Sequence, residues 1–219
     1  MSGEPEGAIA VLVVDDHQVL ADSLVRVLSA ETDIHPVGVA PDLARARAMV
    51  VHHRPDVVLL DHTLPDGEGA DAVRPLLEAN PGMAVVMLTA STSDRVLGAA
   101  MEAGAAGFIS KTSGLSELVT AVRAAARGDA VVSPQLLSRL LVRMRREAQG
   151  VGHDLTDRER EILQLLSKGL TNVAISGQLF LSVHTVRNHI ANLSAKLGAH
   201  SKLEALAIAV REGLVEPPR

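Results

Sequence analysis

Short apolar runs alternate with segments of helical period over the first 127 residues. Near-continuous apolar runs are typical of strands that are buried on both faces, so we interpret each run as a parallel strand. The five runs are residues 8–14, 34–40, 57–60, 84–88 and 107–109. The segments with helical period are residues 18–30, 43–53, 70–80, 94–103 and 115–127. Five such strand–helix units predict a doubly wound α/β domain with a five-stranded parallel sheet.

The pattern changes after residue 127. Gly128 is a plausible helix stop, and we interpret residues 128–153 as a linker with one helix in its basic stretch. From residue 154 onward only helical patterns occur, and Thr156 with Glu159 forms a capping box for the first of them. The predicted helices are residues 157–168, 172–179, 183–197 and 202–212. We therefore predict a first domain at 1–127 and a small, all-α four-helix domain at 154–219.

Composition narrows the range of chemistry. Hydrophobic residues make up 47% of the chain and aromatic residues only 1%, so the core must consist of Leu, Val, Ile and Ala. The chain has no Cys, which excludes disulfides, thiolate metal sites and a Cys nucleophile, and fits the reducing cytoplasm. The N-terminus is acidic and no window approaches the roughly 18 apolar residues of a membrane helix, so we expect no membrane association.

The net charge of −5 conceals an asymmetry between the two halves. Residues 1–128 carry 9 Lys and Arg against 17 Asp and Glu, whereas residues 129–219 carry 12 against 9. An acidic half joined to a mildly basic half is compatible with a regulated DNA-binding protein.

Polar residues of the first domain follow the predicted strands at the edge where sites form in doubly wound sheets. Asp15 and Asp16 end the first strand, Asp61 the third and Thr89 the fourth, while Lys111 lies just past the fifth. Three converging carboxylates repel one another unless a cation joins them, and an all-oxygen cluster suits Mg²⁺. Mg²⁺ and the lysine together could stabilise a phosphoryl group on one carboxylate, with the threonine hydroxyl as a hydrogen-bond donor.

The segments around these residues are VVDDH, VVLLDHTLPDGEG, VVMLTAS and GFISKTS. In this order they resemble the motifs of response-regulator receiver domains, which have a flavodoxin-like fold, and the resemblance covers residues 8–127. It implies that a sensor histidine kinase phosphorylates Asp61. The other implied roles are Mg²⁺ binding by Asp15, Asp16, Asp61 and the backbone carbonyl of Thr63, and switching by Thr89, Phe108 and Lys111. A core aromatic at a strand end explains Phe108 equally well.

The second domain has the layout of a helix-turn-helix. Residues 172–179 and 183–197 form two helices joined by a tight turn, and Ser182 can cap the second helix. Its predicted buried stripe is Val186, Ile190, Leu193 and Leu197. Its opposite face presents Val183, His184, Arg187, Asn188, Ala191 and Lys196.

Residues 154–215 resemble the LuxR-type helix-turn-helix of the NarL/FixJ class. The resemblance implies that Arg187 and Asn188 face the major groove, and that Thr185, Lys196 and Lys202 lie near phosphates. Asn binds adenine and Arg binds guanine bidentately, although a phosphate contact or a solvated charge remains an alternative for Arg187. His184 is interpreted as a surface contact. The last helix has an apolar stripe, which either packs internally or dimerises, and the resemblance favours dimerisation: Leu203, Leu206, Ala207 and Val210.

The combined prediction is a phosphorylation-controlled transcription regulator that is not an enzyme. A sensor histidine kinase phosphorylates Asp61, and the activated homodimer binds double-stranded promoter DNA. One alternative is a Mg²⁺-dependent phosphoaspartyl phosphatase, although such enzymes carry a second carboxylate where this chain has Thr63. Another is a constitutive DNA-binding protein whose first domain is an interaction scaffold.

Overall fold

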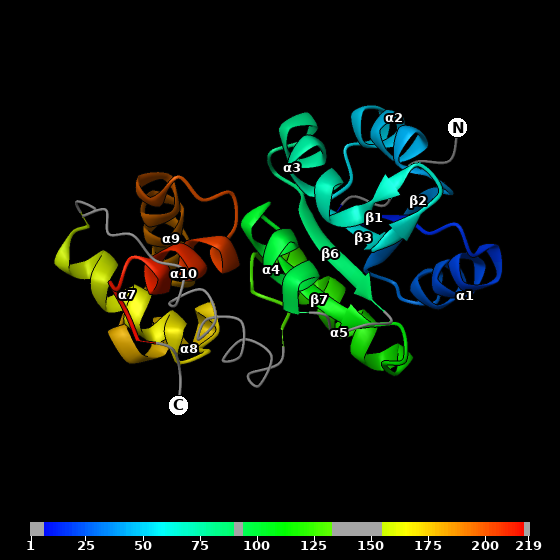
Figure 1. Ribbon diagram of the computed structural model, residues 1–219. Coiled ribbons are helices and arrows are strands. Elements are labelled where there is room, and N and C mark those ends of the chain that lie inside the picture. Colours follow the sequence, from blue (N-terminus) through cyan, green and yellow to red (C-terminus); the bar gives the residue numbers. More distant parts are fainter. Residues whose placement is uncertain (1–6, 90–93, 133–154, 217–219) are drawn as a thin grey trace.

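The structure is a computed structural model that describes residues 7–89, 94–132 and 155–216, drawn as a ribbon in Figure 1. An α/β domain and a helical domain lie side by side, with α4 of the first domain next to the second (Figure 1). The predicted linker helix falls outside the described residues.

Five parallel strands form the sheet of the first domain, in the order β2-β1-β3-β6-β7. The strands are β1 (Ile9–Val14), β2 (Ile34–Ala40), β3 (Val57–Asp61), β6 (Ala84–Thr89) and β7 (Gly107–Ser110). This is the flavodoxin-like doubly wound order, in which the chain reverses direction across the sheet between β1 and β3. The predicted five-stranded parallel sheet is therefore confirmed.

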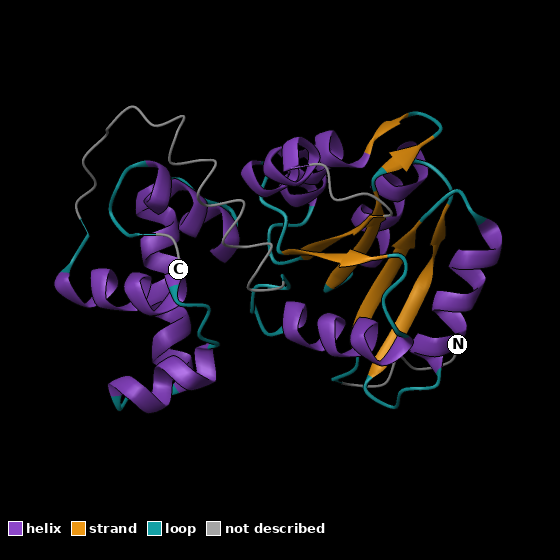
Figure 2. Cartoon of the chain, turned by 60° about the horizontal axis from the view of Figure 1, so that its bottom comes forward, coloured by secondary structure: helices purple, strands orange, loops and turns teal. Residues whose placement is uncertain are grey.

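Helices cover both faces of this sheet, as Figure 2 shows. They are α1 (Gln18–Ser29), α2 (Leu43–His53), α3 (Gly69–Ala79), α4 (Asp94–Glu102) and α5 (Leu115–Ala126). Alternate strand residues pack in two separate clusters: Val11 and Leu59 pack with residues of α1 and α5, whereas Leu12 and Leu60 pack with residues of α2, α3 and α4. Burial on both faces explains why the strands read as continuous apolar runs.

A short hairpin after β3 was not predicted. It pairs β4 (Thr63–Leu64) with β5 (Gly67–Glu68). In its turn, the carboxylate of Asp66 accepts hydrogen bonds from the backbone N–H groups of Leu43 and Ala44, at 2.9 and 3.0 Å. These are orphan donors at the N-terminus of α2, where a carboxylate is favoured, and they lower the pKa of Asp66. The contact fixes the segment that follows Asp61.

The helical domain contains α7 (Asp157–Ser167), α8 (Asn172–Leu179), α9 (Val183–Leu197) and α10 (Lys202–Arg211). The predicted capping box of Thr156 and Glu159 is present at the start of α7. Ser182 caps α9, and Phe180 ends α8 in the left-handed conformation, with φ of 55°. The tight turn between α8 and α9 therefore has the predicted helix-turn-helix form.

The apolar stripes of the last two helices pack inside this domain. Val186 and Leu193 of α9 are fully buried, and so are Leu203 and Val210 of α10. In this docked arrangement the stripe of α10 packs internally, in one hydrophobic cluster with residues of α7, α9 and α4, and dimerisation through it stays a prediction. None of the helices in the described ranges is long and apolar enough to cross a lipid bilayer.

The two domains contact each other through α10. Its neighbour on the first domain is α4, and the side chains of the two helices belong to one hydrophobic cluster. Polar contacts flank this packing: Arg74 Nη2 lies 3.2 Å from Glu204 Oε1, and the Ser201 hydroxyl donates to the carbonyl of Ala105 at 3.2 Å. The helical domain is thus docked on the face of the α/β domain next to α4.

Candidate functional site

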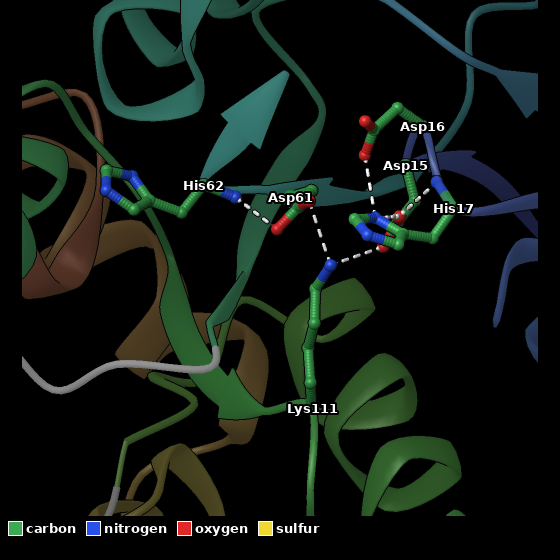
Figure 3. A network of polar contacts seen from close by, with 6 residues as sticks. All are labelled: Asp15, Asp16, His17, Asp61, His62 and Lys111. Atoms are coloured by element: carbon green, nitrogen blue, oxygen red, sulfur yellow. Dashed lines mark hydrogen bonds and ion pairs between the residues drawn. The ribbon is translucent and has the colours of Figure 1, made fainter. Parts of the chain in front are cut away.

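The carboxyl ends of the central strands bring together the predicted acidic residues (Figure 3). Asp15 follows β1 and is 1% exposed, and Asp61 ends β3 and is 4% exposed. Asp16 lies beside them with an exposed side chain. One carboxylate oxygen from each of the three lies within 4.8 Å of the others, in a group that includes His17.

Lys111 joins the two buried carboxylates. Its ammonium lies 2.8 Å from Asp15 Oδ2 and 2.8 Å from Asp61 Oδ2. Burial lowers the pKa of Lys111, but its hydrogen bonds and attraction to Asp15 and Asp61 outweigh this and raise the pKa above its ordinary value. The lysine is therefore charged at neutral pH and aimed at the oxygen atoms of Asp61.

His17 belongs to this pocket, although its residue pattern gave no reason to select it. Its Nδ1 lies 2.8 Å from Asp16 Oδ1 and 3.3 Å from Asp15 Oδ1, and its backbone N–H donates to Asp15 Oδ1 at 2.8 Å. The available signal was its position directly after a pair of acidic residues at a strand end. One ammonium and one imidazole face three carboxylates, so the net charge of the pocket is negative unless it binds a cation.

The backbone around Asp61 is tightly packed. Asp61 Oδ1 accepts a hydrogen bond from the N–H of His62 at 2.7 Å, and the carbonyl of His62 accepts one from Gly69 at 2.7 Å. A Cβ at Gly69 would lie 2.1 Å from the carbonyl oxygen of Asp61, so only glycine fits where α3 begins. The imidazole of His62 points away from the pocket (Figure 3).

The predicted switch residues lie at the ends of β6 and β7. Thr89 is buried, and its carbonyl accepts a hydrogen bond from the N–H of Lys111 at 2.9 Å. Phe108 is 7% exposed, within the hydrophobic cluster on the α4 side of the sheet. A core role accounts for this placement, and the switch role stays a prediction. Thr63 begins β4 directly after the pocket.

The predicted DNA-contacting residues of α9 are mostly exposed. Arg187 and Asn188 are exposed, and the Asn188 amide nitrogen lies 3.3 Å from His184 Nε2. The Ser182 and Thr185 hydroxyls are 2.8 Å apart, and Ser182 also accepts from the Thr185 N–H at 3.0 Å. These two side chains therefore stabilise the start of the helix in this structure.

The two predicted phosphate-contacting lysines have intramolecular partners. Lys196 Nζ lies 2.7 Å from Glu159 Oε2 in the helical domain. Lys202 is partly buried, with its ammonium 3.0 Å from Asn172 Oδ1 and 3.5 Å from Asp129 Oδ1. Their phosphate contacts stay predictions, and for Lys202 they require the docked arrangement to open.

Comparison with known proteins supports the family expected for each of the two domains. Residues 11–123 match the response regulator receiver domain family, and residues 153–209 match the bacterial regulatory proteins of the luxR family. The DNA-binding transcriptional activator DevR/DosR of Mycobacterium tuberculosis is 38% identical over 96% of this chain and 98% of its own. The response regulator protein VraR of Staphylococcus aureus is 32% identical over 95% of this chain and 99% of its own.

Among solved structures, the response regulator ChrA of a heme-sensing two-component system aligns with a TM-score of 0.52 and 32% identity, covering 95% of this chain and 99% of its own. The chain belongs to the response regulators, with a receiver domain followed by a LuxR-type helix-turn-helix domain. It is a DNA-binding transcriptional regulator of the NarL/FixJ class and not an enzyme, so the phosphatase alternative is set aside.

Proposed function

We propose that this regulator is switched by phosphoryl transfer from a sensor histidine kinase to Asp61. The observation that carries the proposal is the position of Asp61: it ends a central strand, is nearly buried, and contacts Lys111 beside two further carboxylates. In the transfer, an oxygen of Asp61 attacks the phosphorus of a phosphohistidine. An O–P bond forms, the N–P bond breaks, and its electron pair returns to the imidazole nitrogen of the kinase.

The residues around Asp61 fit a hard divalent cation. Asp15, Asp16 and Asp61 offer carboxylate oxygens within 4.8 Å of one another, and we propose that they bind Mg²⁺ together with the Thr63 backbone carbonyl. Bound Mg²⁺ would neutralise part of the charge of the incoming phosphoryl group. Lys111 supplies the second positive charge, because its ammonium already lies 2.8 Å from Asp61 Oδ2 and can follow the phosphoryl oxygens.

We propose that the new charge reaches the DNA-binding domain through α4. Phosphorylation converts the singly charged carboxylate of Asp61 into an acyl phosphate with about two negative charges, to which the hydroxyl of Thr89 responds, followed by Phe108. Helix α4 begins shortly after Thr89 along the chain and packs against α10. A full switch between 1:99 and 99:1 populations needs about 5.5 kcal/mol of differential stabilisation.

In the released state we propose a homodimer that binds double-stranded promoter DNA in the cytoplasm. Ser182, His184, Thr185, Arg187, Asn188, Lys196 and Lys202 form the proposed DNA face. Asn188 and Arg187 are the proposed base-reading residues, since both side chains are exposed on α9 and can bind base edges bidentately. Two domains in a dimer reach half-sites roughly 34 Å apart, which is one turn of DNA. We place the domain boundaries at 1–127 and 154–219, with the linker at 128–153.

Selection from a pool of random duplexes tests this function. The full chain is incubated with acetyl phosphate and MgCl₂, bound duplexes are sequenced, and the oligomeric state is followed by light scattering. We expect the wild type to dimerise and to enrich a two-half-site sequence, and we expect Asp61→Asn to do neither. Asp71→Asn, an exposed aspartate on α3, is the matched control and should behave as the wild type. Equal enrichment by the wild type and Asp61→Asn would establish the constitutive alternative instead.

A further inference from the structure

A carboxylate from the start of the linker, Asp129, lies against the helical domain beside Lys202 of the proposed DNA-binding surface. Asp129 follows α5 by three residues and is 7% exposed. Its Oδ1 accepts a hydrogen bond from the N–H of Asn172 at 3.3 Å and lies 3.5 Å from Lys202 Nζ, while its Oδ2 lies 3.7 Å from Arg127 Nε. Asn172 is the first residue of α8, and Lys202 is the first residue of α10. Asp129 is thus bound by two helices of the helical domain.

The two groups that bind Asp129 form what we call the anion clasp, which consists of the Asn172 N–H and the Lys202 ammonium. The side chain of Lys202 is 11% exposed, and its ammonium faces two oxygen atoms, Asn172 Oδ1 and Asp129 Oδ1. Burial lowers the pKa of Lys202, an effect that its attraction to Asp129 only partly offsets. The negative charge of Asp129 therefore offsets part of the cost of burying the ammonium of Lys202.

The same two groups suit a DNA phosphate. A phosphodiester oxygen carries one negative charge and accepts hydrogen bonds, and phosphates are bound by lysines and by backbone N–H groups at helix N-termini. Helix α8 is the supporting helix of the helix-turn-helix, whose first turn lies close to the DNA backbone when α9 enters the groove. In the docked state, Arg187, Ala191 and Ser194 of α9 line a cleft of about 560 Å³ together with Pro81 and Gly82 of the receiver domain. The receiver domain therefore faces the side of α9 that would face DNA.

We propose that Asp129 is an intramolecular substitute for a DNA backbone phosphate. Its carboxylate occupies the anion clasp while the domains are docked, and a phosphate of bound DNA takes its place after they separate. Docking and DNA binding then exclude each other because they compete for one site. This competition acts in addition to the steric block that the docked receiver domain places in front of α9. This inference rests on the proposed DNA-binding function and adds to it the residue that competes with DNA.

A phosphate contact is independent of base sequence, so a random-sequence duplex at low salt is a sufficient probe. The dissociation constant of the unphosphorylated full chain is measured over a range of KCl concentrations for the wild type, Asp129→Asn, Lys202→Met and the double variant. Glu117→Gln, an exposed acid on α5, removes the same charge from the receiver domain away from the clasp.

We expect Asp129→Asn to bind the duplex about tenfold more tightly than the wild type, which corresponds to about 1.4 kcal/mol. Glu117→Gln should change affinity less than about twofold, because a general charge effect falls off with screening. Lys202→Met should lower the slope of log affinity against log salt by about one. In the Lys202→Met background, Asp129→Asn should have little effect, since the clasp is already lost.

A measurement without DNA shows whether each variant is folded, so that a change in affinity is not mistaken for misfolding. Hydrogen exchange at the Asn172 amide should be faster in Asp129→Asn than in the wild type, whereas amides in the middle of α9 should exchange as before. The phosphoryl adduct formed with acetyl phosphate, seen by intact mass, shows that the receiver domain of each variant is intact.

The outcomes separate the two proposals. If wild type and Asp129→Asn bind the duplex equally while phosphorylation still tightens wild-type binding, Asp129 is not a competitor and the switch itself stands. The same conclusion follows if Asp129→Asn tightens binding equally with and without Lys202. If no variant binds DNA in either phosphorylation state, the proposed function is wrong and the inference falls with it.

Discussion

Two polar clusters of this molecule each pair a lysine with a buried carboxylate, yet they balance charge differently. In the receiver domain, Lys111 contacts both Asp15 and Asp61, with Asp16 close by. In the helical domain, Lys196 contacts Glu159, and that carboxylate also accepts hydrogen bonds from the N–H and hydroxyl of Thr156, both at 2.8 Å. The excess of acid distinguishes the first cluster as a place for a ligand.

In the second cluster, the charge of Glu159 is fully paired inside the helical domain. Glu159 is 3% exposed, and its partners satisfy the carboxylate within the domain. Burial raises the pKa of Glu159, but the hydrogen bonds from Lys196 and Thr156 and the attraction of the ammonium outweigh burial and lower the pKa below its ordinary value. A buried lysine–carboxylate pair is therefore no evidence of function until its charges have been counted. Substitutions in the two clusters should have opposite effects on stability.

The largest effect on stability is expected from Lys196→Met. The substitution leaves Glu159 buried without its cation, which should lower the free energy of unfolding of the helical domain by about 2 kcal/mol. Hydrogen exchange of core amides in α7 and α9 measures this domain separately from the receiver domain. Lys168→Met is the control, since Lys168 is exposed at the end of α7. A loss no larger than that of the control would mean that this pair is not structural.

In the receiver cluster we expect the opposite sign. Asp61→Asn removes an excess negative charge and should stabilise the metal-free receiver domain by about 1 kcal/mol, because it relieves repulsion among the three carboxylates. Thermal unfolding in EDTA measures the gain, and MgCl₂ should reduce or reverse it because the cation stabilises the wild type more. Glu78→Gln on α3, an exposed acid, should change the midpoint little in either buffer. A lower midpoint for Asp61→Asn in EDTA would show that the pocket is balanced without a metal.

The smallest effect is a dependence on pH. Because the pKa of Glu159 is lowered from 4.5, its contribution to stability is present above pH 4.5 and is lost as the pH falls through the lowered value. The helical domain of the wild type should therefore lose stability in acid more steeply than that of Glu159→Gln. Hydrogen exchange in α7 at a series of acidic pH values compares the two slopes. Parallel slopes would assign the acid sensitivity of this domain to other carboxylates.

The sequence pattern predicts most of the fold, because the elements have strong periodicity. The bounds of β2, α2, α8 and α9 agree with the prediction, and the other predicted strands and helices within the described residues differ by one residue at one or both ends. The hairpin of β4 and β5 was missed, since a two-residue strand has no periodicity to detect. The convergence of Asp15, Asp61 and Lys111 was predictable because parallel strands end at one edge of the sheet.

Other contacts of the site depend on tertiary structure. His17 has no motif spacing with the other histidines, and its place in the pocket follows from the turn after β1. The contact between Asp129 and Lys202 joins residues that are 73 positions apart, one in the linker and one in the helical domain. Local propensity and periodicity hold no information on such docking, so the intramolecular partner of Lys202 was visible only in the structure.

The central claim is that the excess acid at the strand ends makes Asp61 a phosphoacceptor. The most direct test is the intact mass of the full chain after incubation with acetyl phosphate, with MgCl₂ or with EDTA, for the wild type, Asp61→Asn and Asp71→Asn. We predict one phosphoryl adduct on the wild type and on Asp71→Asn in MgCl₂, and none on Asp61→Asn or in EDTA. An adduct of equal yield on Asp61→Asn, or no adduct on the wild type in MgCl₂, would contradict the claim.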